Sequence, residues 1–145
     1  MPQNGVLRQS LDVNVLADLF LKREEWLTDA VAIWEANRTG RIQYCALASN
    51  IDTLAYLVKR NRAEDARAER DTVRVCLEAL QIVAVTGGIL RDAVERGGPD
   101  FEDDILMSAA VAHAVDVIVT RDGPGFARSP VDVHDPRDFA RIIAR

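Results

Sequence analysis

The chain has 145 residues, which is enough for one folded domain spanning residues 1–145 and too few for two. Its composition is 48% hydrophobic and 28% charged, with 8 Gly and 5 Pro, which excludes collagen-like, disordered and low-complexity proteins. The net charge of −5 excludes a protein that attracts nucleic acid through its overall field, so a polyanionic partner would need a local basic patch or a bound cation.

The first half of the chain is predicted to alternate short strands with amphipathic helices. Leu7 and Leu11 suggest a strand, and Leu16 and Leu19 recur at helical spacing after it. In chain order, we expect a strand ending at Asp12, a helix capped by Asn14, a helix stopped by Gly40, a buried strand over 42–47, a helix capped by Ser49 or Asn50, and a charged amphipathic helix over 63–80.

The second half continues this alternation and sets the fold class. We expect a strand over 82–85, a short helix capped by Thr86 and ended by 97–99, a helix over 100–115, a strand over 117–119, a turn at 123–125, a strand over 131–133 and a last helix over 136–143. Strands that alternate with helices form a parallel sheet covered on both faces. The chain is therefore predicted to be α/β, a three-layer α/β/α sandwich with a central, mainly parallel sheet.

Apolar segments suggest a protein without membrane contact. The longest uncharged, mostly apolar run has eleven residues, against the roughly 20 that span a bilayer, and the N-terminus lacks a signal pattern. We therefore expect a cytoplasmic protein. Cys45 and Cys76 lie in apolar segments and are interpreted as buried thiols. Phe20, Trp26 and Trp34 favour a core role, with a groove for a second copy or a protein partner as the alternative.

Four acidic residues are predicted to gather at one edge of the sheet. Asp12 ends the first strand, Asp122 follows the fourth strand, and Asp100 and Asp103 occupy the first turn of the helix before that strand. Ligands of open parallel sheets bind outside the carboxyl ends of the strands. If the first and fourth strands are neighbours, these carboxylates converge and repel one another, so that Mg²⁺ or Mn²⁺ is the natural occupant.

The same acids also have purely structural explanations. The two acids in the first helical turn could simply favour the positive end of the helix dipole, while Glu102 and Asp104 face solvent. Asp12 could be a helix cap, and Asp122 could open the Gly-Pro-Gly turn. Spacing alone leaves both interpretations open.

Several ordered segments resemble the PIN-domain family. They are residues 11–18 (LDVNVLAD), residues 100–103 (DFED) before an Ala-rich helix, residues 117–122 (VIVTRD), and Phe126 with residues 129–131 before the last helix. In that family an Asp ends the first strand and an Asn follows two positions later. The resemblance covers nearly the whole chain in the right order.

This resemblance implies a PIN-like fold and a metal-dependent endoribonuclease of the VapC toxin type. Carried over residue by residue, the catalytic acids are Asp12, Asp100, Asp103 and Asp122, of which Asp12, Asp103 and Asp122 are the ligands of Mg²⁺ or Mn²⁺. Asn14 and Thr120 would hold the first and last acids in place. The resemblance also implies an RNA substrate, a homodimer and a cognate antitoxin protein as partner.

The chain departs from the family at one acidic position. The family usually has an acid early in the helix after the second strand, where Thr53 stands here. Asp52 is one position away, and a shift of one residue turns a side chain by about 100° around a helix. Whether Asp52 replaces the usual acid stays open.

Two alternative functions therefore remain. The first is a catalytically degenerate domain of the same fold that binds RNA or a protein partner without cleavage. The second is phosphoryl transfer through an aspartyl phosphate at Asp12, which we disfavour because Asn14 stands where the dehalogenase type would have a second Asp.

Basic residues gather in two places that could contact substrate phosphates. They are Lys59, Arg60, Arg62, Arg67 and Arg70 at the junction of two helices, and Arg121 and Arg128 around the last acid. Residues of the first group could instead pair with interleaved acids, in pairs worth a few tenths of a kcal/mol. We favour such pairs for Arg67 and Arg70 and leave both interpretations open for Arg60 and Arg62.

Overall fold

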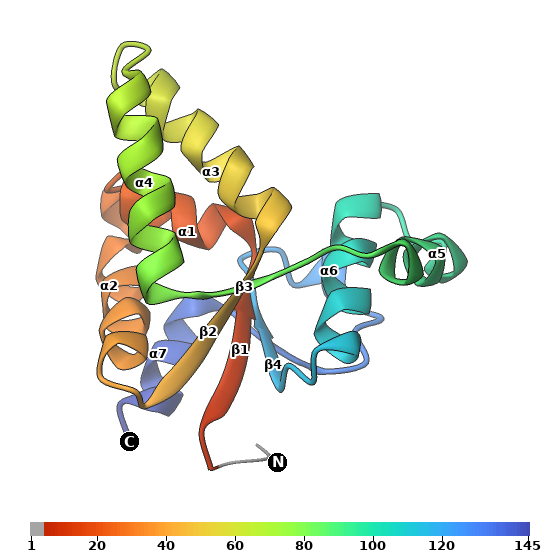
Figure 1. The fold of residues 1–145 in the computed structure, drawn as a ribbon. Helices are drawn as coiled ribbons and strands as arrows, with labels where there is room; N and C mark the ends of the chain where they lie inside the picture. The colour runs from red at the N-terminus through yellow and green to blue at the C-terminus, as the bar shows by residue number, and fades with distance from the viewer. Residues whose placement is uncertain (1–4) are drawn as a thin grey trace.

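The structure is a computed structural model that describes residues 5–145, and its centre is a parallel sheet (Figure 1). The strand order is β3-β2-β1-β4-β5, and each neighbouring pair is parallel. The strands are β1 (Leu7–Leu11), β2 (Ile42–Leu47), β3 (Gln81–Val83), β4 (Val117–Val119) and β5 (Asp132–His134). The first and fourth strands, β1 and β4, are neighbours, which is the condition for the predicted convergence of the acids.

Helices cover both faces of this sheet. They are α1 (Val13–Phe20), α2 (Glu24–Arg38), α3 (Ala48–Asn61), α4 (Ala66–Ala79), α5 (Gly87–Arg96), α6 (Phe101–Ala112) and α7 (Pro136–Ile143), with a 3₁₀ turn η1 (Pro124–Phe126). One core packs α1, α2, α3, α4 and α7 against one face, and a second core packs α5, α6 and η1 against the other. The predicted three-layer α/β/α sandwich is confirmed (Figure 1).

The central strand β1 carries polar residues that the surrounding fold satisfies in part. The Arg8 guanidinium donates to the His113 carbonyl and to Gln81 Oε1, the latter at 3.0 Å. Gln9 and Ser10 are buried, although β1 lies between β2 and β4. Parallel strands are usually runs of apolar residues. The polar residues of β1 are therefore unusual for a strand in the middle of a parallel sheet.

Two predicted helix caps are wrong. The cap of α1 is Asp12, whose side chain accepts the backbone N–H of Asn14. Helix α3 begins directly after Leu47 without a side-chain cap, so neither Ser49 nor Asn50 has the predicted role. In both places the helix begins earlier than predicted, immediately after the strand. By contrast, Thr86 caps α5 as predicted.

Two helices are shorter than predicted because the backbone adopts a left-handed conformation beside them. Ala63 and Glu64 have φ of 53° and 62°, so α4 begins only at Ala66, after the cap Asp65. Ala114 has φ of 53°, and α6 accordingly ends at Ala112. A left-handed residue cannot continue a right-handed helix.

The thiols and most of the aromatic residues are in the core. Cys45 and Cys76 are free and buried, and burial raises the pKa of the Cys76 thiol to about 11. Phe20 and Trp34 meet edge to face with ring centroids 5.7 Å apart. Trp26 is only half-buried and lies instead under the guanidinium of Arg121. Among the helices within residues 5–145, none has the length and apolarity to cross a bilayer.

Candidate functional site

Asp12 is held at the carboxyl end of β1 by both of its neighbouring elements. Its backbone N–H donates to the Val119 carbonyl at 3.1 Å, which continues the pairing with β4. Its Oδ1 accepts the backbone N–H of Asn14 at 3.4 Å, and its Oδ2 accepts the Thr120 hydroxyl at 3.1 Å. The predicted contact with Thr120 is therefore present, while Asn14 acts through its backbone.

Asp122 is tied to the same threonine. Its backbone N–H donates to Thr120 Oγ1 at 3.0 Å, and its Oδ1 accepts the backbone N–H of Gly125 at 3.2 Å. Thr120 is 1% exposed, whereas the Asp122 residue is exposed. One buried hydroxyl thus links the first and last predicted site acids.

Asp103 comes from the first turn of α6 and meets Asp122 at Gly125. A Cβ added to Gly125 would lie 2.5 Å from Asp122 Oδ2 and 2.8 Å from Asp103 Oδ2. The two carboxylate oxygens therefore face the same glycine and lie no farther apart than the sum of these distances. Asp100 caps α6, with its Oδ1 accepting the Asp103 N–H at 3.2 Å.

The pKa of Asp103 reflects the neighbouring acids. Burial, followed by the charges of Asp100, Asp12, Asp122 and Glu102 in that order, raises the pKa of Asp103 to about 7. Asp52 is exposed on α3 and is not among the carboxylates that raise this pKa. The structure thus brings Asp12, Asp100, Asp103 and Asp122 to one edge of the sheet.

The carboxylates do not form a finished metal site. Within residues 5–145, no three His, Cys, Asp or Glu side chains already stand at the spacing of metal ligands. One oxygen of Asp12 accepts the Thr120 hydroxyl, and one oxygen of Asp122 accepts the Gly125 N–H. Because all donors are carboxylates, the set fits a hard divalent cation such as Mg²⁺ or Mn²⁺.

Asp104 does not face solvent as predicted. It is 3% exposed, and its Oδ2 accepts the backbone N–H of Gly98 at 2.9 Å. It shares the buried face of α6 with Met107 and Ser108, three and four residues further on. That helical spacing was the available sequence signal. Glu102 is exposed, as predicted.

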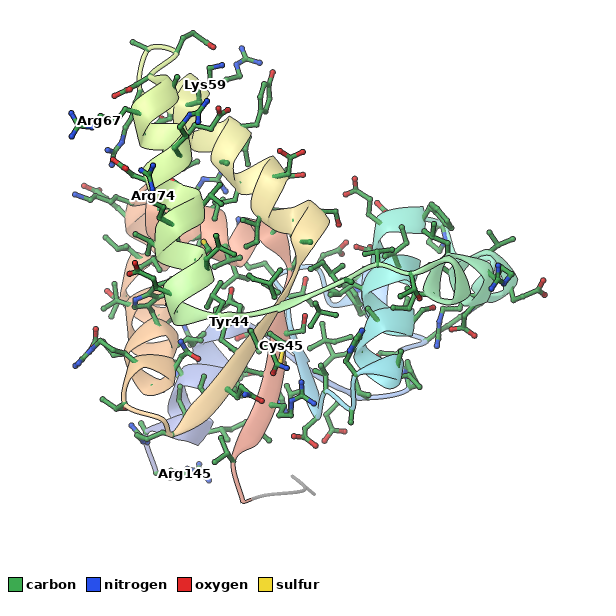
Figure 2. The ribbon with its side chains drawn as sticks, in the orientation of Figure 1. Tyr44, Cys45, Lys59, Arg67, Arg74 and Arg145 are labelled. Carbon is green, nitrogen blue, oxygen red and sulfur yellow. The ribbon has the colours of Figure 1, made fainter. Side chains whose placement is uncertain are left out.

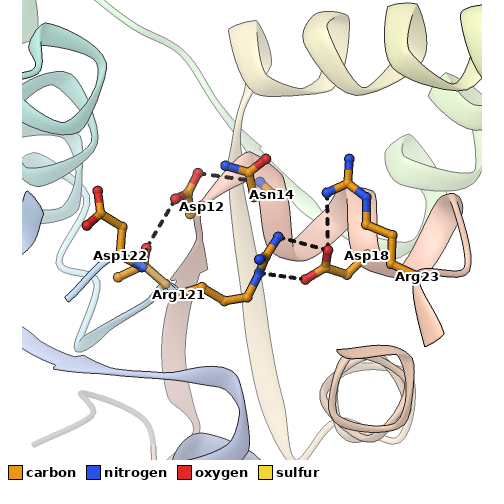
Figure 3. A network of polar contacts seen from close by, with 7 residues as sticks. Asp12, Asn14, Asp18, Arg23, Arg121 and Asp122 are labelled. Atoms are coloured by element: carbon orange, nitrogen blue, oxygen red, sulfur yellow. Dashed lines mark hydrogen bonds and ion pairs between the residues drawn. The ribbon is translucent and has the colours of Figure 1, made fainter. Parts of the chain in front are cut away.

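A buried ion-pair network beside the acids was not predicted (Figure 3). The Asp18 carboxylate is 1% exposed and lies 3.2 Å from Arg23 Nη1 and 3.0 Å from Arg121 Nε. The Arg121 guanidinium also lies 3.7 Å from the centre of the Trp26 ring. Arg121 is thus engaged on the protein and points away from Asp122, contrary to its suggested role as a free contact for phosphates. An acid on the apolar face of α1 was the signal, because such a residue needs a partner.

The raised pKa of Asp103 predicts how the stability of the metal-free protein depends on pH. The folded state holds the proton up to about pH 7, whereas an unfolded Asp releases it near pH 4. The free energy of unfolding therefore decreases as pH rises from about 4 to about 7. Asp103→Asn should raise the melting temperature at pH 8 in EDTA and flatten this decrease. The exposed Asp52→Asn is the control, and an unchanged pH profile for Asp103→Asn would contradict the assignment.

Comparisons with known proteins agree on one family and one fold. The sequence model of the PIN domain matches residues 8–123. No curated protein sequence matches the chain significantly. A toxin–antitoxin complex from Klebsiella pneumoniae has 21% sequence identity and a TM-score of 0.66, covering 88% of this chain and 97% of that chain.

Two further solved structures are similar. VapC20 of Mycobacterium tuberculosis, described as a sarcin-ricin loop cleaving toxin, has 15% identity and a TM-score of 0.68, covering 86% of this chain and 98% of its own. VapBC2 of Rickettsia felis, bound to a DNA fragment from its promoter, has 15% identity and a TM-score of 0.64, covering 88% and 97%. At these identities the likeness to solved structures is one of fold. Since the family model covers most of the sequence, the chain belongs to the PIN domain family.

Proposed function

We propose that this protein is a Mg²⁺- or Mn²⁺-dependent endoribonuclease that acts in the cytoplasm. Asp12, Asp103 and Asp122 are the proposed metal ligands, and Asp100 is a fourth catalytic acid. The observation that carries the proposal is geometric: the Thr120 hydroxyl donates to Asp12 and accepts the backbone N–H of Asp122, and oxygens of Asp103 and Asp122 face the same glycine, Gly125. Elements so distant in sequence bring negative charge to one edge, where a divalent cation would offset it.

The chain's own residues position these ligands. The Thr120 hydroxyl orients one oxygen of Asp12 and accepts the backbone N–H of Asp122, and the Gly125 N–H orients Asp122. When bound, the cation supplies charge neutralisation at a phosphodiester and a more acidic water. The proton of Asp103 must leave before its carboxylate can serve as a ligand, so metal affinity should rise with pH.

We propose further that the protein is a toxin with a cognate antitoxin. Its support is the set of structurally similar proteins, one of which is described as a toxin–antitoxin complex and another as a cleaving toxin. The RNA substrate is proposed by analogy with the described target of VapC20. The proposal includes a homodimer, for which α5 projects from the sheet (Figure 1) and carries the exposed apolar residues Leu90 and Val94.

A second candidate function is RNA or protein binding without cleavage. Two observations favour it. Asp52 is exposed and is not among the carboxylates that raise the pKa of Asp103, and the Thr53 hydroxyl, at the family's usual acidic position, donates to the Ser49 carbonyl of its own helix. In addition, within the described residues no three acids already stand at ligand spacing. Such a domain would bind its partner equally well with and without a divalent cation.

The first experiment incubates single-stranded RNA with the protein and Mn²⁺. We expect cleavage that EDTA stops and that Asp12→Asn reduces by at least about a hundredfold, because this change removes a proposed ligand charge. Gel electrophoresis of end-labelled RNA measures the rate. Asp52→Asn is the matched control and should cleave at the wild-type rate. Binding without cleavage would favour the second candidate function.

A second experiment tests the metal ligands through Gly125. In Gly125→Ala, the new Cβ would crowd oxygens of both Asp103 and Asp122, so these carboxylates must turn away. We expect Mn²⁺ affinity, measured by isothermal titration calorimetry, to fall about tenfold or more, as when partners of metal ligands are disturbed. Gly88→Ala is the control, since its Cβ meets only Thr86 Oγ1 at 3.7 Å. Equal affinities in both variants would remove Gly125 from the site.

The toxin assignment predicts a growth phenotype. Induced production of the wild-type protein in a bacterial host should arrest growth, whereas Asp12→Asn at the same protein level should not, because RNA cleavage is the proposed cause. Co-production of the proposed cognate antitoxin should restore growth. Growth arrest by Asp12→Asn as strong as by the wild type would contradict cleavage as the cause.

A further inference from the structure

The exposed face of α3 carries a continuous stripe of polar and aromatic side chains. Its members are exposed and recur at intervals of three or four residues, so they lie along one face of the helix. They are Ser49, Asp52, Thr53, Tyr56 and Arg60. The opposite face of α3 packs into the core through Ile51, Leu54 and Val58. This stripe, residues 49–60, is therefore open to a partner from end to end.

The stripe begins at the acidic edge of the sheet. Strands β1 and β2 are parallel with Ser10 opposite Cys45, so Leu47 stands level with Asp12, and α3 starts at the next residue. At a rise of 1.5 Å per residue, Arg60 lies about 16 Å along the helix from Ser49. A chain molecule held at the acids could follow α3 from the sheet edge to the tip of the α3–α4 hairpin (Figure 1).

The side chains of Tyr56 and Arg60 are in contact near the far end of the stripe. Tyr56 is 52% exposed, and Arg60 Nη1 donates to its hydroxyl at 3.3 Å. The guanidinium carbon of Arg60 lies 5.8 Å from the centre of the Tyr56 ring. An exposed aromatic ring beside an arginine is the combination on which single-stranded nucleic acids stack a base and place a phosphate.

The positive charges around this pair favour an anionic partner. Residues 59–74 contain six Lys and Arg against four Asp and Glu, although the whole chain has a net charge of −5. Arg74 is paired with Asp71, but among residues 5–145 no carboxylate lies within 4.0 Å of the cations of Lys59, Arg60, Arg62, Arg67 or Arg70. The predicted ion pairs of Arg67 and Arg70 are thus absent, and Figure 2 shows Lys59 and Arg67 near the tip.

We propose that the α3 stripe binds single-stranded RNA, with a base stacked on Tyr56 and the adjacent phosphate held by Arg60. The proposal rests on the proposed ribonuclease function and deepens it. It states that the substrate is an extended single strand of RNA that lies along α3, on one side of the acidic edge. A single strand fits because its bases are free to stack on an exposed ring. The competing explanation is that a protein partner binds to α3. In that case the Kd for RNA would not change when Tyr56 is substituted.

The test measures the Kd of a fluorescein-labelled single-stranded RNA of mixed sequence by fluorescence anisotropy in EDTA, where no cleavage is expected. Tyr56→Ala should raise Kd about tenfold, the size of one lost base–aromatic stack, while Tyr56→Phe should bind like the wild type. Arg60→Ala should reduce the slope of log K against log salt by about 0.7, one phosphate contact on a single strand. Leu77→Ala, an exposed apolar change on α4, and Arg38→Ala, the same charge change on α2, are the controls.

The possible results separate this proposal from the ribonuclease. If Tyr56→Ala binds as tightly as the wild type, the stripe is overturned even when the protein cleaves RNA. It is overturned equally if Arg38→Ala lowers the salt slope as much as Arg60→Ala, or if Tyr56→Phe loses affinity like Tyr56→Ala. If the expected pattern appears in a protein that never cleaves, the stripe is supported and the nuclease proposal fails. Circular dichroism of the exposed-site variants verifies that each is folded.

Discussion

A single buried hydroxyl connects the two halves of the acidic edge. Thr120 Oγ1 donates to Asp12 and accepts the backbone N–H of Asp122, and it is almost fully shielded from water. A hydrogen bond in such surroundings is stronger than one exposed to solvent. Because β1 and β4 are paired in parallel, this hydroxyl joins chain segments more than a hundred residues apart.

The acidic edge is electrostatically unfavourable when it stands alone. Asp103 is half-buried and surrounded by the charges of Asp12, Asp100 and Asp122, which is why its pKa approaches neutrality. Structural explanations such as helix capping do hold for Asp12 and Asp100, but they do not require four carboxylates to be neighbours. The capping function and the charge cluster therefore coexist in the same residues.

Much of this arrangement could be predicted from the sequence because it depends on local patterns and one topological rule. The strands over 42–47 and 117–119 and the helix over 136–143 have the predicted bounds, since apolar runs and a proline mark them clearly. The convergence of Asp12, Asp103 and Asp122 followed from the rule that ligands gather at the carboxyl ends of parallel strands. That rule needs only the order of elements and one correct pair of neighbouring strands.

The remainder depends on tertiary contacts that no local pattern contains. The cap of α1 is Asp12 and not Asn14 because the helix begins directly at the strand end. Asp104 is buried and its carboxylate accepts the backbone N–H of Gly98, which belongs to the preceding loop. Gly125 has no room for a side chain because carboxylates from two different elements lie beside it. Spacing in the sequence cannot reveal such approaches, since each depends on where a separate loop lies in space.

Arg121 and Asp122 are adjacent in the chain, yet their side chains leave the backbone in opposite directions (Figure 3). The reason is Asp18, whose buried carboxylate takes the guanidinium into the interior beside Trp26. Held by Asp18, the guanidinium does not pair with the neighbouring Asp122 carboxylate, so the charge of Asp122 stays available to a dissolved cation. Asp18 thereby preserves the negative potential of an edge that it never touches.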